Sequence, residues 1–211
     1  MKKTVHALAF GALIMSMCAS LHAEYRPYVD LGFGYSGLTS MPEGDDFGDL
    51  AGVVPAGTGT STPDNYGGRV AAGLLWNTQE TLSYGLEAAA AYYGVDKYAN
   101  DAASVEMNYY GLEFLGVAQL NLDKLRLIAK AGVTDEQLHP TKSNINNSSF
   151  TDSQQILPEV GAGVAYAITP NLQLGLTFYH TFGSTVSFDN TGEACNLPSV
   201  NMSLLEFMYL L

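Results

Sequence analysis

The sequence predicts an all-β protein: an eight-stranded antiparallel up-and-down transmembrane barrel. Three observations lead to this prediction. Apolar residues alternate with small or ionisable residues in eight segments, each of roughly the ten residues that a tilted membrane-spanning strand needs. The connections between these segments are alternately short and long. The last segment, "LLEFMYLL", remains apolar up to the end of the sequence, as a closing strand of a barrel in lipid would.

The N-terminal region is expected to be removed before the barrel forms. Lys2 and Lys3 precede a mostly apolar run over residues 5–19, and Ala23 closes a short region of small residues. This pattern predicts a secretory signal peptide over residues 1–23 and one outer-membrane β-barrel domain over residues 24–211. No later stretch approaches the ~18 consecutive apolar residues of a transmembrane helix, so a helical membrane protein is excluded.

The net charge and the cysteine content of the chain limit the partners and the disulfides that we expect. The chain carries 9 basic and 21 acidic residues, a net charge of −12. Loss of Lys2 and Lys3 takes this from −12 to −14, and nucleic acid is therefore not expected as a partner. Cys18 leaves with the signal peptide, so Cys195 stands alone and no internal disulfide is expected. No motif predicts a cofactor.

The alternation separates each strand into two faces. None of the positions on the apolar face is charged, and we expect this face to contact lipid. Its residues are Val29, Leu31, Phe33, Tyr35, Val70, Ala72, Leu74, Trp76, Tyr84, Leu86, Ala88, Ala90, Tyr92, Tyr110, Leu112, Phe114, Ala118, Leu120, Leu125, Leu127, Ala129, Ala131, Val133, Val160, Ala162, Val164, Tyr166, Ile168, Leu172, Leu174, Leu176, Phe178, Leu205, Phe207, Tyr209 and Leu211.

The opposite face combines glycines with ionisable residues, which predicts the crowded inside of a narrow barrel. A slip of one residue would exchange the two faces and place a charge against hydrocarbon in seven of the eight strands. One Lys or Arg at the membrane midplane costs about 2–4 kcal/mol, so the register is strongly specified.

The connections predict the orientation. Three are short and polar, "NTQET", "NLDK" and "TPN", whereas residues 37–67, 95–107, 134–155 and 183–200 are predicted as long loops. Bacterial outer-membrane barrels have short periplasmic turns and long extracellular loops. Both termini are therefore predicted to lie in the periplasm.

At this point the chain resembles a known family, the small eight-stranded outer-membrane β-barrels of the outer-membrane protein A and X type. The resemblance rests on an ordered set of segments: "YVDLGFGYSG", "YGLEAAAAYYG", "KLRLIAKAGV", "PEVGAGVAYAITPNLQLGLTFYHTFG" and "FMYLL". It implies a Gram-negative outer-membrane protein, with no peptidoglycan-binding domain expected. In that family the last strand resembles a recognition signal for the barrel-assembly machinery; Phe207 and Tyr209 match it, and Leu211 stands where Phe is usual.

The ionisable residues of the inner face suggest an interior charge network. Two interpretations are open: a satisfied polar plug, or a gated narrow water path lined by ion pairs. We favour the plug, because buried charges are costly unless they are paired. Arg69 is expected diagonal to Glu87, and Lys130 within reach of Glu113. The full predicted network is Arg69, Glu87, Glu113, Lys130, Glu159 and Glu206.

The long loops are acidic, and the first carries Glu43, Asp45, Asp46, Asp49 and Asp64 with no Lys or Arg. One interpretation is a surface that binds an unidentified cationic partner or divalent ions, and the sign of the charge disfavours polyanions such as heparin. The run "EGDDFGD" lacks the ligand spacing of a calcium loop and is interpreted as a solvated surface, so no metal site is predicted. The other expected partners are outer-membrane lipids, and the protein is expected to be a monomer.

The predicted function is that of a non-enzymatic barrel serving envelope integrity, host contact or a narrow pore. The alternative is a lipid-modifying enzyme similar to a lipid A deacylase, which would use His180 and Ser184 near the outer rim. Their spacing is not the close spacing of such enzymes, and no orienting carboxylate shares their face. No catalytic residue is therefore assigned.

Overall fold

The computed structural model describes residues 25–39, 60–79, 81–99, 104–143, 152–184, 187–188 and 194–211. The predicted signal peptide and the loop residues Glu43, Asp45, Asp46 and Asp49 lie outside these ranges, as does the side chain of Cys195. The strands are β1 (Tyr25–Thr39), β2 (Thr60–Asp64), β3 (Tyr66–Gln79), β4 (Leu82–Ala99), β5 (Ser104–Leu122), β6 (Leu125–Ser143), β7 (Ser153–Ala167), β8 (Leu172–Thr181), β9 (Ser187–Phe188), β10 (Ala194–Asn196) and β11 (Ser199–Leu210).

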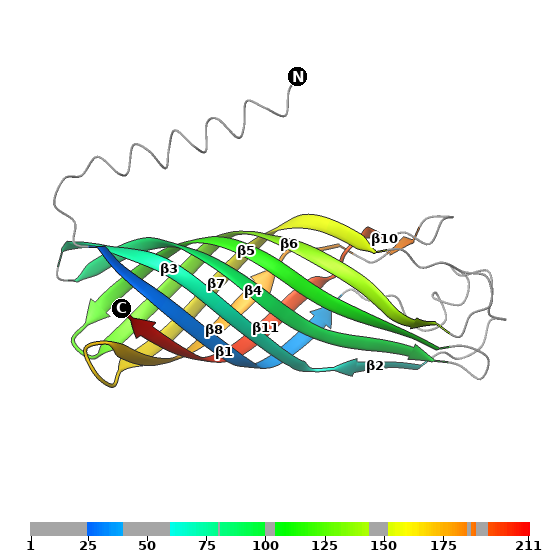
Figure 1. The fold of residues 1–211 in the computed structure, drawn as a ribbon, viewed down its shortest axis with the longest axis horizontal. Helices are drawn as coiled ribbons and strands as arrows, with labels where there is room; N and C mark the ends of the chain where they lie inside the picture. The colour runs from blue at the N-terminus through cyan, green and yellow to red at the C-terminus, as the bar shows by residue number, and fades with distance from the viewer. Residues whose placement is uncertain are drawn as a thin grey trace, which may run out of the picture.

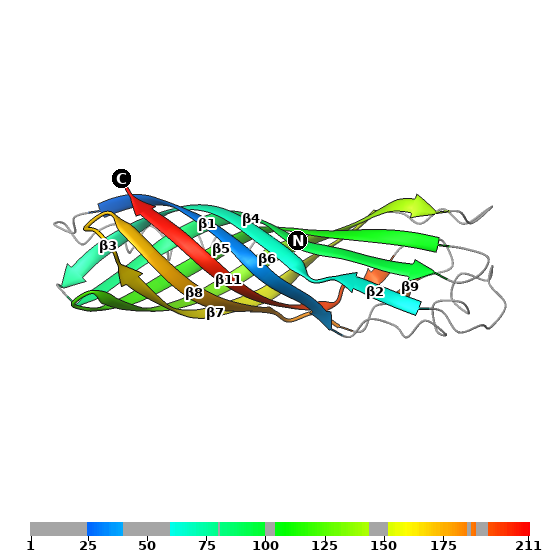
Figure 2. The ribbon, with the colours of Figure 1, turned by 90° about the horizontal axis from the view of Figure 1, so that it is seen from below.

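Eight of these strands close an antiparallel barrel, which confirms the predicted fold (Figure 1). The order around the barrel is β1, β3, β4, β5, β6, β7, β8 and β11, and β11 pairs back to β1 from Tyr28↔Leu210 to Thr39↔Ser199. Figure 2 shows β11 between β1 and β8. The apolar C-terminal segment is thus the closing strand, and both of its edges are paired.

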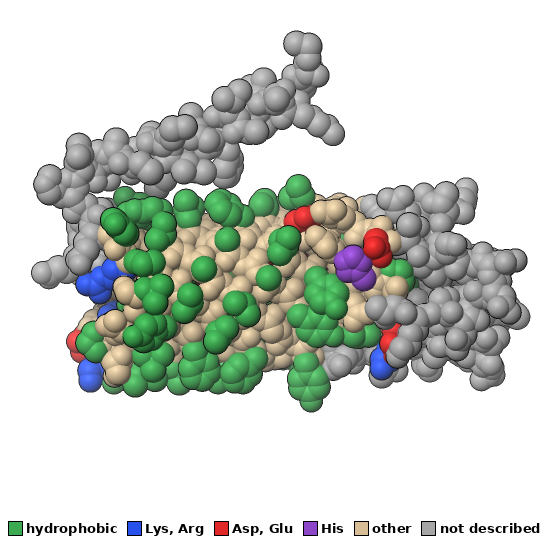
Figure 3. Space-filling model, viewed as in Figure 1, with side chains coloured by type: hydrophobic (Ala, Val, Ile, Leu, Met, Phe, Trp, Pro, Cys, Tyr) green, Lys and Arg blue, Asp and Glu red, His purple; other side chains and the backbone are tan. Residues whose placement is uncertain are grey.

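The predicted sidedness is also confirmed. Side chains on the apolar face are exposed around the barrel, and Figure 3 shows hydrophobic groups spread over its outer wall. Leu204 and Leu205 are neighbours in β11, yet the first is 0% and the second 36% exposed. Among the described residues, no helix has the length and apolar character needed to span a membrane.

The short connections lie where the sequence places them. Leu122 and Leu125 pair directly across the turn between β5 and β6, in which Asp123 adopts a φ of 56°. Aspartate is one of the few residues that tolerate this left-handed conformation, since its short polar side chain can form local hydrogen bonds.

Two predicted loops are wrong in extent, because strand pairing continues through most of their length. β4 extends to Ala99 and β5 starts at Ser104, within the loop predicted over residues 95–107. β6 continues to Ser143 through "DEQLHPTKS", which was expected to be loop. The physical reason is that a strand beyond the membrane no longer needs apolar outward residues, so the alternation fades while the backbone ladder persists.

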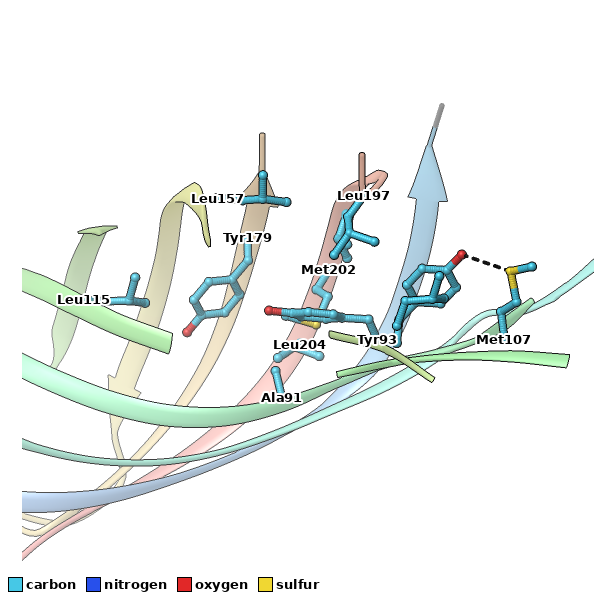
Figure 4. Close-up of a cluster of buried hydrophobic side chains, with 12 residues drawn as sticks. Ala91, Tyr93, Met107, Leu115, Leu157, Tyr179, Leu197, Met202 and Leu204 are labelled. Atoms are coloured by element: carbon cyan, nitrogen blue, oxygen red, sulfur yellow. Dashed lines mark hydrogen bonds between the residues drawn. The ribbon is translucent and has the colours of Figure 1, made fainter. Parts of the chain in front are cut away.

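The predicted composition of the inner face is incomplete. Large apolar side chains share it with the glycines and charges and form two clusters. The first, here called the outer cluster, lies toward the extracellular end and comprises Ala91, Tyr93, Met107, Tyr109, Leu115, Leu138, Leu157, Tyr179, Leu197, Val200, Met202 and Leu204 (Figure 4). The second, the inner cluster, lies toward the periplasmic end and comprises Tyr28, Leu75, Val117, Ile128, Ala165, Met208 and Leu210.

Candidate functional site

A buried ion network occupies the lumen between the two apolar clusters. Arg69 projects inward from β3 because it alternates with the lipid-facing Val70. Its Nη2 lies 2.5 Å from Glu87 Oε1 on β4, and its Nε lies 2.6 Å from Glu113 Oε2 on β5. All three side chains are almost fully shielded from solvent. One guanidinium thus bridges two carboxylates from successive strands, a geometry suited to the planar fork of arginine.

Lys130, on β6, is the second cation of the network. Its Nζ lies 3.1 Å from Glu87 Oε2 and 3.7 Å from Asp30 Oδ2, and it donates a hydrogen bond of 2.7 Å to the Tyr179 hydroxyl. Tyr28 donates a further hydrogen bond of 2.8 Å to Glu87. Glu87 therefore accepts from two cations and a phenol and is the best satisfied carboxylate of the lumen.

Glu206 links the closing strand to this network. It accepts hydrogen bonds of 2.5 Å from Thr177 and from Tyr179, and its Oε1 lies 3.8 Å from both Arg69 Nη1 and Lys130 Nζ. The Tyr179 ring also faces both cations, with Arg69 Cζ 4.8 Å and Lys130 Nζ 5.2 Å from its centroid. Side-chain contacts therefore cross the lumen and stabilise the barrel. They come from β3, β4, β5, β6, β8 and β11.

The structure brings together five of the six predicted network residues, with different partners in places. Arg69 contacts Glu87 as expected, but the ion pairs of Lys130 are with Glu87, Asp30 and Glu206 instead of the expected Glu113, which Arg69 takes. Asp30, Tyr28 and Tyr179 also belong to the network, although they were not predicted as members of it. Their positions on the inner face were readable from the alternation, but the tyrosines carry no charge to draw attention to them.

Glu159 is buried but separate from the network, and Glu136 on β6 behaves in the same way. Neither oxygen of either carboxyl group has a hydrogen-bond partner among the described residues. Among the residues that the structure describes, the buried charged side chains are seven acidic and two basic ones, namely Asp30, Glu87, Asp96, Glu113, Glu136, Glu159 and Glu206 against Arg69 and Lys130. The described part of the lumen therefore has an excess of acidic groups, and Glu136 and Glu159 form no ion pair with the two cations.

The strands that extend past the apolar belt form a sheet outside the membrane. On β6 the last lipid-facing apolar residue is Val133, and the outward positions that follow are Asp135, Gln137 and His139. β2 adds to this sheet by pairing with β4 from Thr60↔Ala99 to Asp64↔Val95. The surface carries exposed polar pairs such as Lys97–Glu106 at 3.2 Å and His139–Asp152 at 3.1 Å. Among the described residues, no cluster of His, Cys, Asp and Glu is arranged to hold a metal ion.

The two residues considered for catalysis do not form a nucleophile–base pair. His180 Nδ1 lies 2.7 Å from Asn201 Oδ1, and its ring packs edge-on against Phe182 with centroids 4.4 Å apart. Ser184 follows the strand and donates its backbone N–H to the Leu197 carbonyl. The interactions of His180 are therefore those of an aromatic residue at the membrane border.

The predicted assembly residues lie on the lipid-facing side of β11. Phe207 and Tyr209 point outward, and Phe207 stacks on Phe33 of β1 with ring centroids 6.1 Å apart. The backbone N–H of Leu211 donates to the Pro27 carbonyl at 2.8 Å, which ties the end of the strand to β1.

A closed antiparallel barrel with an apolar outer wall and a side-chain-filled lumen defines a transmembrane β-barrel of the bacterial outer membrane. The sequence comparison agrees: residues 7–198 match the outer membrane protein beta-barrel domain family, and the chain belongs to that family.

Individual relatives are distant. An uncharacterized protein of Coxiella burnetii (strain RSA 493 / Nine Mile phase I) is 24% identical over 94% of this chain and 90% of its own length. Among solved structures, the chain is similar to Ail, the attachment invasion locus protein of Yersinia pestis, with 10% identity, 90% and 100% coverage and a TM-score of 0.48. It is also similar to Neisserial surface protein A, with 12% identity, 89% and 98% coverage and a TM-score of 0.45.

Proposed function

We propose that this protein is a sealed, non-enzymatic barrel that acts through the surface it presents outside the membrane. The observation that carries the proposal is the filling of the lumen. The central ion network lies between the outer and inner clusters, so charged and apolar layers alternate along the barrel axis. An eight-stranded barrel has an interior just wide enough for its own side chains, which supports a plug over a water path.

The sealed lumen is tested by conductance. Purified protein inserted in planar bilayers is expected to give no discrete conductance steps at neutral pH. An Arg69→Ala, Lys130→Ala double variant serves as the comparison, because it removes both cations that brace the network. Discrete steps from the wild-type protein would support the narrow-pore alternative and contradict this proposal.

The extracellular sheet and the acidic loops support a binding role. β4, β5 and β6 carry their backbone ladders beyond the apolar belt, which gives the loops a rigid base. Binding residues are often found on loops held by such a scaffold. The acidic character of the first loop favours a cationic partner, for example a basic protein surface.

Binding is tested with nanodisc-embedded protein on polylysine-coated and heparin-coated surfaces. We expect binding to polylysine alone, weakening as salt is raised because exposed charges are screened. The matched variant replaces Glu43, Asp45, Asp46 and Asp49 by the corresponding amides and should lose most of this binding. Equal binding by the variant, or preference for heparin, would contradict the proposed charge recognition.

One observation favours the enzymatic alternative. A hydrogen bond between Asn201 and His180 orients the His180 ring. A general base held in this way needs a nucleophile within hydrogen-bond reach. Incubation of the purified protein with lipid A should release no acyl chains. Release that disappears in a His180→Ala variant would replace the binding role by a lipid A deacylase-like activity.

A further inference from the structure

The chain returns into the mouth of the barrel just before β11. Leu197 is 1% exposed and belongs to the outer cluster, so its side chain lies inside the barrel (Figure 4). The backbone of Leu197 is held on both sides. Its N–H donates a hydrogen bond of 3.0 Å to Gln155 Oε1 on β7, and its carbonyl accepts one of 2.8 Å from the Ser184 N–H. We call residues 196–199 the mouth segment.

Two buried carboxyl groups without partners lie on the strands next to this segment. Glu136 on β6 and Glu159 on β7 are 0% and 1% exposed, and none of their carboxyl oxygens has a hydrogen-bond partner among the described residues. Glu136 pairs directly with Gln155 across β6 and β7. Side chains in such a pair have Cβ atoms about 4.5–5.5 Å apart. The residue that holds the mouth segment is therefore the cross-strand neighbour of a buried acid.

Both acids have apolar neighbours along their own strands. On the inner face of β6, Glu136 is followed by Leu138, and on the inner face of β7, Glu159 is preceded by Leu157. Both leucines belong to the outer cluster, as Leu197 does. The two carboxyl groups are thus enclosed by the same apolar side chains that receive the mouth segment.

The surrounding groups provide no compensating charge. Arg69 and Lys130 are the only cations among the buried described residues, and all their ion pairs are with other carboxylates. The Tyr93 hydroxyl is already hydrogen-bonded within the lumen. The other buried titratable groups on the inner face of the described strands are Tyr28 and Asp30 of β1, Glu87 and Asp96 of β4, Tyr109 and Glu113 of β5, Tyr179 of β8 and Glu206 of β11.

A buried carboxyl group without a partner is more stable in its neutral form than as a carboxylate. Glu136 lies beyond the apolar belt, and burial raises the pKa of its carboxyl group from 4.5 to about 8. The folded protein therefore holds a proton at neutral pH that the unfolded chain would release. Because the pKa is higher in the folded state, this group makes the barrel less stable as the pH rises through that interval.

We propose that the mouth segment opens when Glu136 and Glu159 ionise, and that water then enters the outer part of the lumen. An ionised carboxylate at either position has no cation to pair with, so water is the donor that can satisfy it. The mouth segment is the part that yields, because exposing one leucine costs less than keeping an unpaired charge dry. The strands around it are held by continuous backbone pairing.

This inference rests on the proposed sealing of the lumen at neutral pH and adds a condition that ends it. The test measures contact of the Leu197 methyl groups with a water-soluble gadolinium chelate. Methyl-labelled protein in nanodiscs is compared at about pH 6.5 and about pH 9.5, on either side of the raised ionisation range. Every protein carries Cys195→Ser, because a thiol ionises in the same interval.

We expect the Leu197 resonances to be unaffected by the chelate at the lower pH and strongly broadened at the higher pH. Leu31, which is exposed on the lipid-facing wall, is the internal control. Its resonances should be unaffected at both pH values, which shows that the barrel remains folded and inserted.

Two double variants separate the buried acids from a general effect of pH. Glu136→Gln with Glu159→Gln removes both ionisable groups with little change in shape, so Leu197 should stay protected at both pH values. Asp135→Asn with Asp152→Asn is the matched control, because these carboxyl groups lie on the outside of the same region and bind Gln154 and His139. It should leave the pH-dependent broadening unchanged.

Gln155→Leu tests the connection between the acids and the mouth segment. It removes the hydrogen bond to the Leu197 N–H, so less energy is needed to open the mouth. The pH at which broadening is half complete should fall by up to about one unit, the equivalent of one net hydrogen bond. An unchanged midpoint would overturn the inference.

The remaining outcomes also decide between the two proposals. Protection of Leu197 at both pH values in the parent protein, or broadening that persists when both acids are amides, would overturn the inference and leave the sealed barrel intact. Loss of the pH dependence in the Asp135→Asn, Asp152→Asn control would overturn it as well. Broadening of Leu197 at both pH values would contradict the sealed lumen itself.

Discussion

At the scale of single residues, the lumen contains carboxyl groups with opposite energetic roles. Glu87 is almost fully buried and accepts hydrogen bonds from Arg69, Lys130 and Tyr28. Glu136 is 0% exposed and has no hydrogen-bond partner among the described residues. A buried polar group without a partner loses its hydration and gains nothing in return. The same substitution should therefore have opposite effects at the two sites.

We predict that Glu136→Gln stabilises the barrel, because a neutral amide is less costly to bury than an unpartnered carboxylate. The expected gain is about 1–3 kcal/mol. Urea unfolding in detergent micelles, followed by tryptophan fluorescence, measures the change. Glu87→Gln is the control and should destabilise the barrel, since it weakens two ion pairs and a hydrogen bond. A loss of stability in Glu136→Gln would mean that the carboxylate has a partner.

We also predict that Lys130→Met destabilises the barrel by about 3–5 kcal/mol, the usual cost of leaving buried charges unpaired. It removes ion pairs to Glu87 and Asp30 at once. Lys97→Met is the control: Lys97 is 54% exposed and pairs with Glu106 on the surface, where such pairs contribute about 0–1 kcal/mol. Equal stability of the two variants, by the same unfolding assay, would show that the network does not hold the barrel together.

At the scale of elements, strands were predicted correctly where they cross the membrane, because lipid there imposes an alternation with a period of two residues. Each lipid-facing position must be apolar, so alternation marks β1, β3, β8 and β11 with the correct faces. Prediction failed for the parts of the strands that extend beyond the membrane. "DEQLHPTKS" in β6 lacks the apolar period because water, and not lipid, meets its outward side chains. The pairing that keeps it extended, such as Gln137↔Tyr110, is a long-range contact that no local pattern reveals.

The closing strand carries a prediction about assembly. Leu211 stands where the resembling family usually has Phe, and its backbone already pairs with Pro27. We propose that Leu211→Phe improves recognition by the barrel-assembly machinery without changing the register of β11. The folded fraction recovered from outer membranes, measured by heat-modifiable gel migration, should rise. A matched Leu210→Phe change, on the inner face, should lower it by overpacking the inner cluster. An unchanged folded fraction in Leu211→Phe would count against an assembly role for this residue.

At the scale of the whole molecule, the barrel resembles an inverted globular protein with a partly polar core. The ionisable half of that core was predictable, because charges cannot face lipid. The apolar half was not, since Met202, Leu204 and Met208 alternate with Ser203, Leu205 and Phe207, and both faces of β11 are then largely apolar. Glu206 identifies the inner face of β11, but the pattern does not show that Met202, Leu204 and Met208 fill the lumen beside it. The partner choices of Lys130 likewise depend on side chains reaching across the lumen.

The most direct test of this account compares two adjacent leucines. In nanodiscs with methyl-labelled leucine, nitroxide on the lipid chains should broaden the methyl resonances of Leu205 and spare those of Leu204. A water-soluble gadolinium chelate should broaden neither, because one residue faces lipid and the other a filled lumen. Broadening of Leu204 by the chelate would show an open lumen. Broadening of Leu205 by the chelate would contradict the membrane-facing wall itself.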